Sequence, residues 1–261
     1  MKVETADIQE MMRHLRLCVV VPTYNNRGTL EAVVEAILAY SPMLIVVDDG
    51  STDETKAVLA EIAGRDEYKG RIEVIESAPN RGKGYSLGLG FDKAEELGYK
   101  GAITMDSDGQ HYASDITKFV DVAADYKGYM LIGQRSTEGD MPMKNTFANK
   151  FSNFWFTVHT GRRLSDTQNG FRLYPLAEMR GLRPLSSRYE AELEMLVRSA
   201  WRGIRIMPVP VRVYYPPENE RVTHFRPGKD FFRISVLNTL FTILAIVYGY
   251  PSMLYHYLRR L

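Results

Sequence analysis

Short apolar runs alternate with amphipathic stretches along the first half of the chain. Residues 17–21, 43–47 and 101–103 are continuous apolar runs of strand length, and each ends in polar turn residues. Between the first two runs, residues 30–38 carry apolar side chains at the 3.6-residue spacing of a helix. Strands that are apolar throughout and alternate with helices predict an α/β fold, in which a mostly parallel sheet is covered by helices on both faces.

The same patterns predict the remaining elements. Thr29 is placed to cap the helix at 30–38, and two prolines within residues 204–213 predict an edge strand there. Further strands are expected at residues 71–76 and 129–135, and further helices at 1–16, 54–63, 87–94, 141–160 and 188–201.

Composition is that of one large folded domain with an appendage. The 261 residues are 45% hydrophobic and 25% charged, and the net charge of +1 gives no reason to expect nucleic acid as a partner. The single cysteine, Cys18, lies in an apolar run and is expected in the core. Residues 1–16 lack the uninterrupted apolar stretch of a signal peptide, so we expect a cytoplasmic protein.

Three polar loops follow predicted strands, at residues 22–25, 48–51 and 106–110. Ligands of open parallel sheets bind at the carboxyl ends of the strands. The three loops are therefore expected to face one crevice.

The third loop has the pattern of a divalent-cation site. Asp106 and Asp108 are two residues apart and point to the same side of an extended backbone, while Gly109 permits a turn that returns Gln110 as a further oxygen ligand. Oxygen ligands suit Mg²⁺ or Mn²⁺ and not zinc. The alternative is an ordinary surface turn, for which Asp, Ser and Gly are common residues.

A glycine-rich basic turn at residues 80–84 precedes the predicted helix at 87–94. Backbone N–H groups at a helix N-terminus, together with Lys83, would suit an anion. The alternative is a plain turn.

Taken together, the motifs at residues 21–26, 47–53, 80–84 and 106–111 resemble the nucleotide-sugar half of a family 2 glycosyltransferase with the Rossmann-like GT-A fold. The resemblance implies an inverting enzyme whose first two loops hold a nucleoside and whose Asp-x-Asp motif holds a divalent cation on the diphosphate. The base, uridine or guanosine, stays open. Carried over by position, the implied donor-binding residues are Pro22, Tyr24, Asn25, Asp48, Asp49, Lys83 and Asp106, and the implied metal ligands are Asp106, Asp108 and Gln110.

The second half resembles one branch of that family. The extension of the metal motif to Gln110 and the Asp-x-x-x-Gly-Phe-Arg pattern of residues 166–172 are similar to the branch of dolichyl-phosphate mannose synthase and bacterial polyprenyl-phosphate glycosyltransferases. The implied acceptor is undecaprenyl or dolichyl phosphate. We expect a catalytic domain over residues 1–230, divided into a nucleotide-sugar-binding half (17–111) and an acceptor half (112–230).

The nature of the acceptor decides which residues act in catalysis. A sugar hydroxyl would need a carboxylate base, for which Asp166, Glu190 and Glu192 are candidates. An ionised lipid phosphate would instead need cations that align it. For both Asp166 and Glu190, a structural role such as holding Arg172 is an equal alternative. The candidate cations are Arg135, Lys144, Arg172 and Arg221, of which Arg221 and Lys144 are expected to bind the acceptor phosphate.

The C-terminal segment, residues 231–261, is apolar with scattered polar residues, and basic residues flank it. A break is expected at 249–251, where Gly and Pro occur, giving a pair of amphipathic helices on the cytoplasmic membrane surface. Two alternatives are helices packed on the domain or on a second copy in a homo-oligomer, and a single membrane span. Rival functions are transfer to a saccharide hydroxyl and a non-catalytic nucleotide-sugar-binding scaffold.

Overall fold

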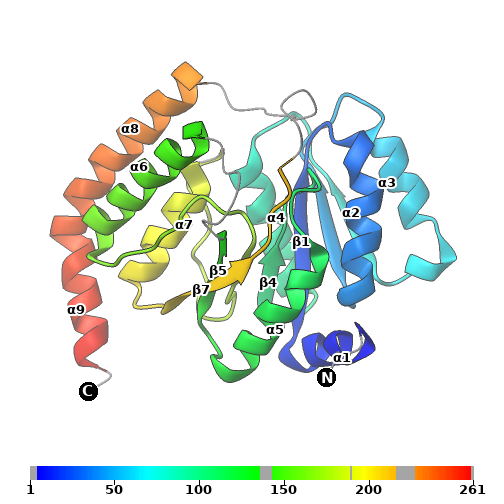
Figure 1. The fold of residues 1–261 in the computed structure, drawn as a ribbon, viewed down its shortest axis with the longest axis horizontal. Helices are drawn as coiled ribbons and strands as arrows, with labels where there is room; N and C mark the ends of the chain where they lie inside the picture. Colours follow the sequence, from blue (N-terminus) through cyan, green and yellow to red (C-terminus); the bar gives the residue numbers. More distant parts are fainter. Residues whose placement is uncertain (1–4, 136–142, 189, 216–226, 260–261) are drawn as a thin grey trace.

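The computed structural model describes residues 5–135, 143–188, 190–215 and 227–259 (Figure 1). Its seven-stranded sheet has the order β3-β2-β1-β4-β6-β5-β7. All neighbouring strands pair in parallel except β6, which runs antiparallel to both β4 and β5. The mostly parallel sheet predicted from the sequence is confirmed. The strands are β1 (Leu17–Thr23), β2 (Leu44–Asp48), β3 (Ile72–Glu76), β4 (Gly101–Thr104), β5 (Met130–Arg135), β6 (Arg172–Tyr174) and β7 (Ile206–Val211).

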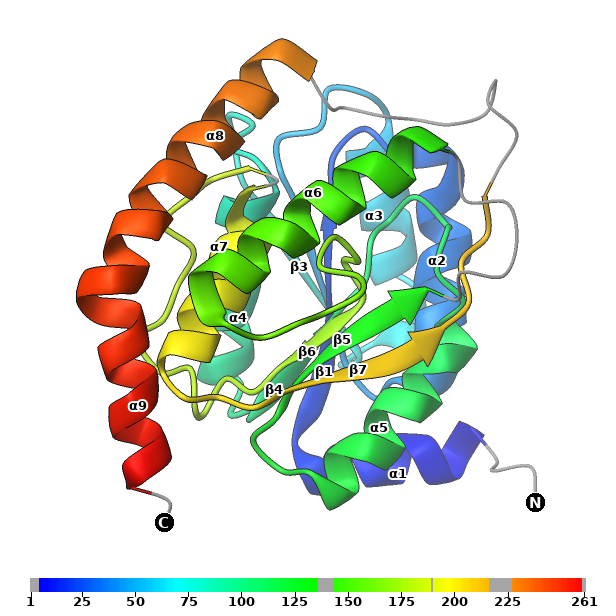
Figure 2. The same ribbon diagram turned by 60° about the vertical axis from the view of Figure 1, so that its left-hand side comes forward.

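Helices cover both faces of the sheet, as the ribbon views show (Figures 1 and 2). Alternate residues of β1 serve the two cores, with Val19 facing the core that contains α1, α2, α3 and α5, and Val20 the core that contains α4, α6, α7 and α8. Cys18 is buried, as predicted. The helices are α1 (Thr5–Leu15), α2 (Arg27–Tyr40), α3 (Thr55–Ala63), α4 (Lys83–Glu96), α5 (Ile116–Asp125), α6 (Met143–Thr160), α7 (Glu190–Trp201), α8 (Pro227–Leu244) and α9 (Tyr250–Leu258).

The predicted capping role of Thr29 is wrong. Helix α2 begins at Arg27, so Thr29 lies inside its first turn. Its hydroxyl donates to the backbone carbonyl of Ser107 at 2.6 Å. Thr29 thus ties α2 to the Asp106–Asp108 loop.

The predicted break at residues 249–251 is also wrong. A π-helical turn (Ala245–Gly249) joins α8 to α9, and the three segments form one continuous but bent rod beside α6 and α7 (Figure 2). Pro251 falls in the first turn of α9, where a missing N–H is tolerated. Within the described part of the chain, residues Ile234–Leu258 are the one helix long and apolar enough to cross a membrane, with a mean hydropathy of 1.5.

Candidate active site

The first two loops at the carboxyl ends of the strands are fastened to each other by Asn25. Its backbone N–H donates to the Ser51 hydroxyl at 2.9 Å, and its side-chain oxygen accepts from the Thr52 N–H at 2.8 Å. Asn25 has a φ of 53°, a left-handed conformation that Asn tolerates better than most residues. Next to it, Pro22 is buried and Tyr24 is half-buried. The loops expected to hold the nucleoside therefore form one unit.

The side chains of Asp48 and Asp49 are buried, and both accept hydrogen bonds from backbone N–H groups. Asp48 accepts from the Ser51 N–H at 3.1 Å. Asp49 accepts from the N–H groups of Arg81 and Gly82 at 2.9 and 2.6 Å. Burial raises the pKa of Asp49, although these two N–H groups oppose the shift. Asp49 thus holds the glycine-rich turn at the start of α4 against the end of β2.

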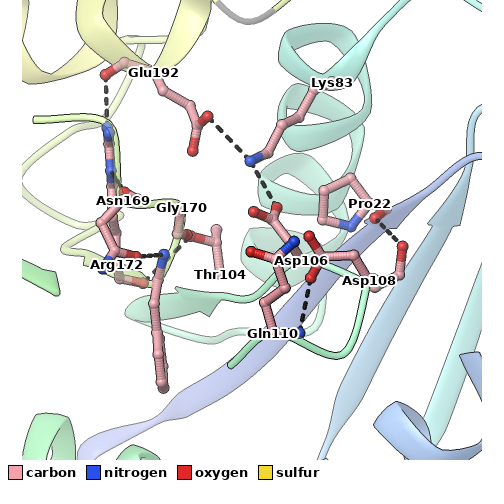
Figure 3. Close-up of polar contacts among 12 residues, drawn as sticks. Pro22, Lys83, Thr104, Asp106, Asp108, Gln110, Asn169, Gly170, Arg172 and Glu192 are labelled. Atoms are coloured by element: carbon pink, nitrogen blue, oxygen red, sulfur yellow. Dashed lines mark hydrogen bonds and ion pairs between the residues drawn. The ribbon is translucent and has the colours of Figure 1, made fainter. Parts of the chain in front are cut away.

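Lys83, the first residue of α4, lies between two carboxylates (Figure 3). Its ammonium nitrogen is 2.6 Å from Asp106 Oδ1 and 3.0 Å from Glu192 Oε2. Burial opposes the charge on Lys83, but the two carboxylates raise its pKa above the usual value. Burial likewise opposes the charge on Asp106, but Lys83 holds its pKa below the usual value. The ion-pair network joins α4, the loop after β4 and α7 at one point.

Gly170 lies directly against this network. A side-chain carbon added there would be 2.7 Å from Asp106 Oδ2 and 2.9 Å from Lys83 Nζ. The carbonyl of Gly170 accepts from the Thr104 hydroxyl at 2.7 Å, which fixes it to the end of β4. Only glycine fits such a close approach without displacing the ion pair.

Asp108 gives the loop its second carboxylate. Burial, and then the charge of Asp106, raises the pKa of Asp108 to about 6, and its Oδ1 accepts from the Gln110 N–H at 3.0 Å. Two carboxylates that repel each other across a short loop are a donor set that fits a hard divalent cation. In the described ranges, no group of three or more His, Cys, Asp or Glu side chains gathers to hold a metal ion. The chain would thus supply only part of a coordination shell, as is common for Mg²⁺.

Arg135 and Asp166 form a bidentate ion pair on the acceptor side. Arg135, at the end of β5, contacts Asp166 Oδ2 through Nε at 2.6 Å and Oδ1 through Nη2 at 2.8 Å. Burial opposes the charge on Arg135, but Asp166 raises its pKa above the usual value. Both oxygens of Asp166 are occupied, so this carboxylate is poorly suited to act as a base.

Arg172 departs from the sequence-based expectation. It is fully buried, and it donates to the backbone carbonyls of Asn169, Glu192 and Thr167 at 2.7, 2.6 and 2.8 Å. These three bonds use the Arg172 guanidinium to hold the backbone in place. A group bonded in this way is poorly suited to align an acceptor. Of the other expected cations, Arg221 lies outside the described residues, as does the side chain of Lys144.

Several buried polar atoms near the Lys83 network have no partner within the described part of the chain. They are Asn169 Nδ2, Glu190 Oε2 and Glu192 Oε1. Buried polar groups are nearly always hydrogen-bonded, so atoms of this kind are suited to a ligand. Sequence reasoning named Glu192 only as a possible base. Its contact with Lys83, 109 residues away, has no local signal.

A mostly parallel sheet with acidic loops and a lysine network at the ends of its strands is the arrangement expected of a GT-A fold. The chain belongs to glycosyl transferase family 2, whose model matches residues 18–180. It is 29% identical to the polyprenol monophosphomannose synthase of Mycolicibacterium smegmatis, over 75% of this chain and 76% of that protein. It is 27% identical to the UDP-N-acetylglucosamine–dolichyl-phosphate N-acetylglucosaminyltransferase of Methanococcus voltae, over 84% of this chain and 94% of that protein.

Solved structures share the fold. Glucosyl-3-phosphoglycerate synthase of Mycobacterium tuberculosis, in complex with Mn²⁺, UDP and glucosyl-3-phosphoglycerate, superposes with a TM-score of 0.63 at 17% identity, over 95% of this chain and 84% of that chain. Its complex with phosphoglyceric acid gives a TM-score of 0.66 over 93% and 85%. These matches confirm the GT-A fold expected from the sequence.

Proposed function

We propose that this glycosyltransferase transfers a sugar from a UDP- or GDP-sugar to a polyprenyl phosphate, with inversion at the anomeric carbon. An oxygen of the acceptor phosphate attacks the anomeric carbon, and the bond from this carbon to the diphosphate oxygen breaks. The observation that carries the proposal is the Lys83 network at the ends of the central strands, in a chain whose relatives are named for transfer to polyprenol and dolichyl phosphates.

On the donor side, the leaving diphosphate gains negative charge as the bond breaks, and cations fixed beforehand stabilise that charge. Lys83 is such a cation, because Asp106 and Glu192 hold its ammonium group in place. The unpartnered oxygens of Glu190 and Glu192 supply acceptors for hydroxyl groups of the transferred sugar. The tied loops around Asn25 would receive the nucleoside.

A divalent cation, Mg²⁺ or Mn²⁺, completes the proposed donor site. Asp106, Asp108 and Gln110 are the residues that would hold it. When bound, it supplies positive charge for the diphosphate. The two carboxylates in one short loop support this assignment, because the charge of Asp106 adds to the effect of burial in raising the pKa of Asp108.

On the acceptor side, both oxygens of Asp166 bond to Arg135, which favours a phosphate over a hydroxyl as the acceptor group. A phosphate arrives ionised and needs no base, whereas a hydroxyl must lose its proton. Arg135, held by Asp166 with a raised pKa, keeps the positive charge that would align an anionic acceptor. Transfer to a saccharide hydroxyl would require Glu190, whose Oε2 is unpartnered, to act as the base.

A radiolabel or mass-spectrometric assay with UDP- and GDP-sugars, undecaprenyl phosphate and Mn²⁺ tests this function. We expect the wild-type protein to form a glycosylated lipid phosphate. Asp108→Asn should lower turnover by at least about 100-fold, because a group that stabilises the leaving charge is lost. Asp121→Asn, an equal charge change at an exposed position of α5, is the matched control and should keep full turnover. Full turnover of Asp108→Asn would overturn the metal assignment.

The rod of α8 and α9 supports a location at the cytoplasmic face of a membrane. Its protein-facing side combines apolar and polar contacts. Phe241 is buried against the rings of His159 and Trp201. Asn238, Ala245 and Gly249 are also buried, and Ser252 donates to the Trp201 carbonyl at 2.8 Å. Its outward side is apolar and exposed. That side includes Leu240, Ile243, Ile246, Val247 and Leu254.

This exposed apolar side suits contact with lipid. The rod packs along α6 and α7 from Asn238 to Ser252, which favours a helix lying along the membrane over one that crosses it. The expected membrane association is thus retained as a proposal, with one rod in place of a helix pair.

Co-sedimentation with anionic phospholipid vesicles tests the membrane contact. Val247, 73% exposed, is replaced by Asp, and Leu185, 81% exposed in a loop away from the rod, receives the same change as control. We expect Val247→Asp to weaken binding by about 10-fold or more, because a charge would enter the acyl region, and Leu185→Asp to bind like wild type. A wild-type protein that stays in the supernatant, or forms a dimer that Val247→Asp splits, would overturn this contact.

A further inference from the structure

Helix α6 lies over the acceptor loop, residues 164–172, and Asn153 makes three of the hydrogen bonds that hold the loop there. Asn149 also donates to the Ser165 carbonyl at 3.2 Å, and the Thr167 hydroxyl bonds to the Ser152 hydroxyl at 2.7 Å. Asn153 donates from Nδ2 to the Ser165 carbonyl at 2.7 Å. Its Oδ1 accepts from the N–H of Thr167 at 2.9 Å and from the Thr167 hydroxyl at 2.8 Å. Asparagine is a poor helix former in mid-helix, where its amide competes with backbone bonds. Here the amide serves the loop instead.

The two residues that Asn153 holds are the neighbours of Asp166. With Ser165 and Thr167 fixed to α6, the Asp166 carboxylate is directed at Arg135 and forms the bidentate pair at 2.6 and 2.8 Å. The backbone N–H of Arg135 also donates to Asp166 Oδ2, at 3.3 Å. The direction of the Arg135 guanidinium therefore depends on where α6 holds the loop.

We propose that Asn153 is a positioning residue for the acceptor, which acts by clamping the loop so that Asp166 aims Arg135 at the acceptor phosphate. This inference rests on the proposed function, since Arg135 is there assigned to the acceptor. Both polar atoms of the Asn153 amide bond to the loop, so we assign Asn153 an action through the loop.

The clamp predicts that a change at Asn153 affects use of the acceptor and binding of the donor to different extents. The Asn153 side chain bonds to Ser165 and Thr167, whereas the Lys83 network is held from α4, the loop after β4 and α7. Loosening the clamp should therefore impair use of the acceptor more strongly than donor binding. A residue that only stabilised the fold would lower both together.

The test compares three variants with the wild type by steady-state kinetics, donor titration and hydrogen–deuterium exchange. Asn153→Ala removes all three hydrogen bonds. Asn153→Asp keeps the oxygen that accepts from Thr167, loses the donor to Ser165, and serves if the alanine variant does not fold. Thr157→Val is the control on the same helix, because the Thr157 hydroxyl donates only to the Asn153 backbone carbonyl, at 2.9 Å.

For Asn153→Ala we expect kcat/KM for polyprenyl phosphate to fall about 10- to 100-fold, as for a misplaced catalytic group. The donor Kd should stay within about twofold of the wild-type value, and exchange in residues 165–169 should accelerate. Asn153→Asp should lie between Asn153→Ala and wild type, and Thr157→Val should match wild type.

Two results would overturn the clamp: unchanged exchange in residues 165–169 of Asn153→Ala, or an equal loss of donor and acceptor binding. Lack of lipid-phosphate product from the wild-type protein would overturn the proposed function instead. The exchange measurement needs no substrate, so the two failures are distinguishable.

Discussion

Replacing Lys83 by methionine removes the ammonium group from the centre of the site and keeps a side chain of similar length. The change leaves Asp106 and Glu192 without the cation that now lies 2.6 and 3.0 Å away. The side chains of Lys83, Asp106 and Glu192 are 16%, 31% and 10% exposed, so water screens the stranded carboxylates only in part. Breaking a buried ion pair costs about 3–5 kcal/mol. Because Asp106 is partly exposed, we expect a loss of about 3 kcal/mol in the free energy of unfolding.

For a chain of this size, that loss lowers the unfolding midpoint by about 6–12 °C. Thermal unfolding followed by circular dichroism measures it. Lys93→Met is the matched control on the same helix, since Lys93 pairs with Glu96 at 3.0 Å but the two side chains are 26% and 68% exposed. A surface pair of this kind contributes about 0–1 kcal/mol. Equal midpoints for the two variants would refute the view that Lys83 is a buried, doubly paired cation.

Three further results are expected. Gly170→Ala should reduce sugar transfer by about 10-fold or more, since its new carbon would lie 2.7 Å from Asp106 Oδ2. The control Gly28→Ala, whose new carbon would have nothing within 4 Å, should keep wild-type turnover. Equal turnover of the two variants would argue against the close approach at Gly170. Treatment with EDTA should abolish transfer, and added Mn²⁺ or Mg²⁺ should restore it; persistent transfer would exclude the metal site. Burial raises the pKa of Cys18 well above its usual range, so its thiol should react with a disulfide reagent only after denaturation, and rapid reaction of the native protein would contradict its place in the core.

The local pattern of apolar and polar residues was sufficient to predict most of the fold. Continuous apolar runs predicted β1, β2 and β4, because their alternate residues, such as Val19 and Val20, serve cores on both faces of the sheet. It also placed the three polar loops together, since the carboxyl ends of parallel strands share one edge. Strand β6 was missed, because three residues are too few to show a period and its antiparallel insertion is a tertiary feature.

No local sequence pattern indicated the contacts between side chains within the site. Arg172 was expected to align the acceptor because it is a cation within the Asp-x-x-x-Gly-Phe-Arg pattern, but a sequence does not reveal that a guanidinium is buried among carbonyls. The pairing of Lys83 with Glu192 joins two residues that are 109 positions apart in the sequence. The hydrogen bonds of Asn153 join helix α6 to the acceptor loop. Such contacts depend on packing, which periodicity and motif spacing do not describe.

A competition between two lipid acceptors tests the central claim most directly. The wild-type protein is given its sugar nucleotide, Mn²⁺ and equal amounts of a polyprenyl phosphate and the corresponding polyprenol, and mass spectrometry identifies the products. Because Asp166 is engaged by Arg135 and the acceptor phosphate needs no base, we expect the sugar to appear on the phosphate alone. Sugar on the free hydroxyl, with the phosphate unmodified, would contradict the account.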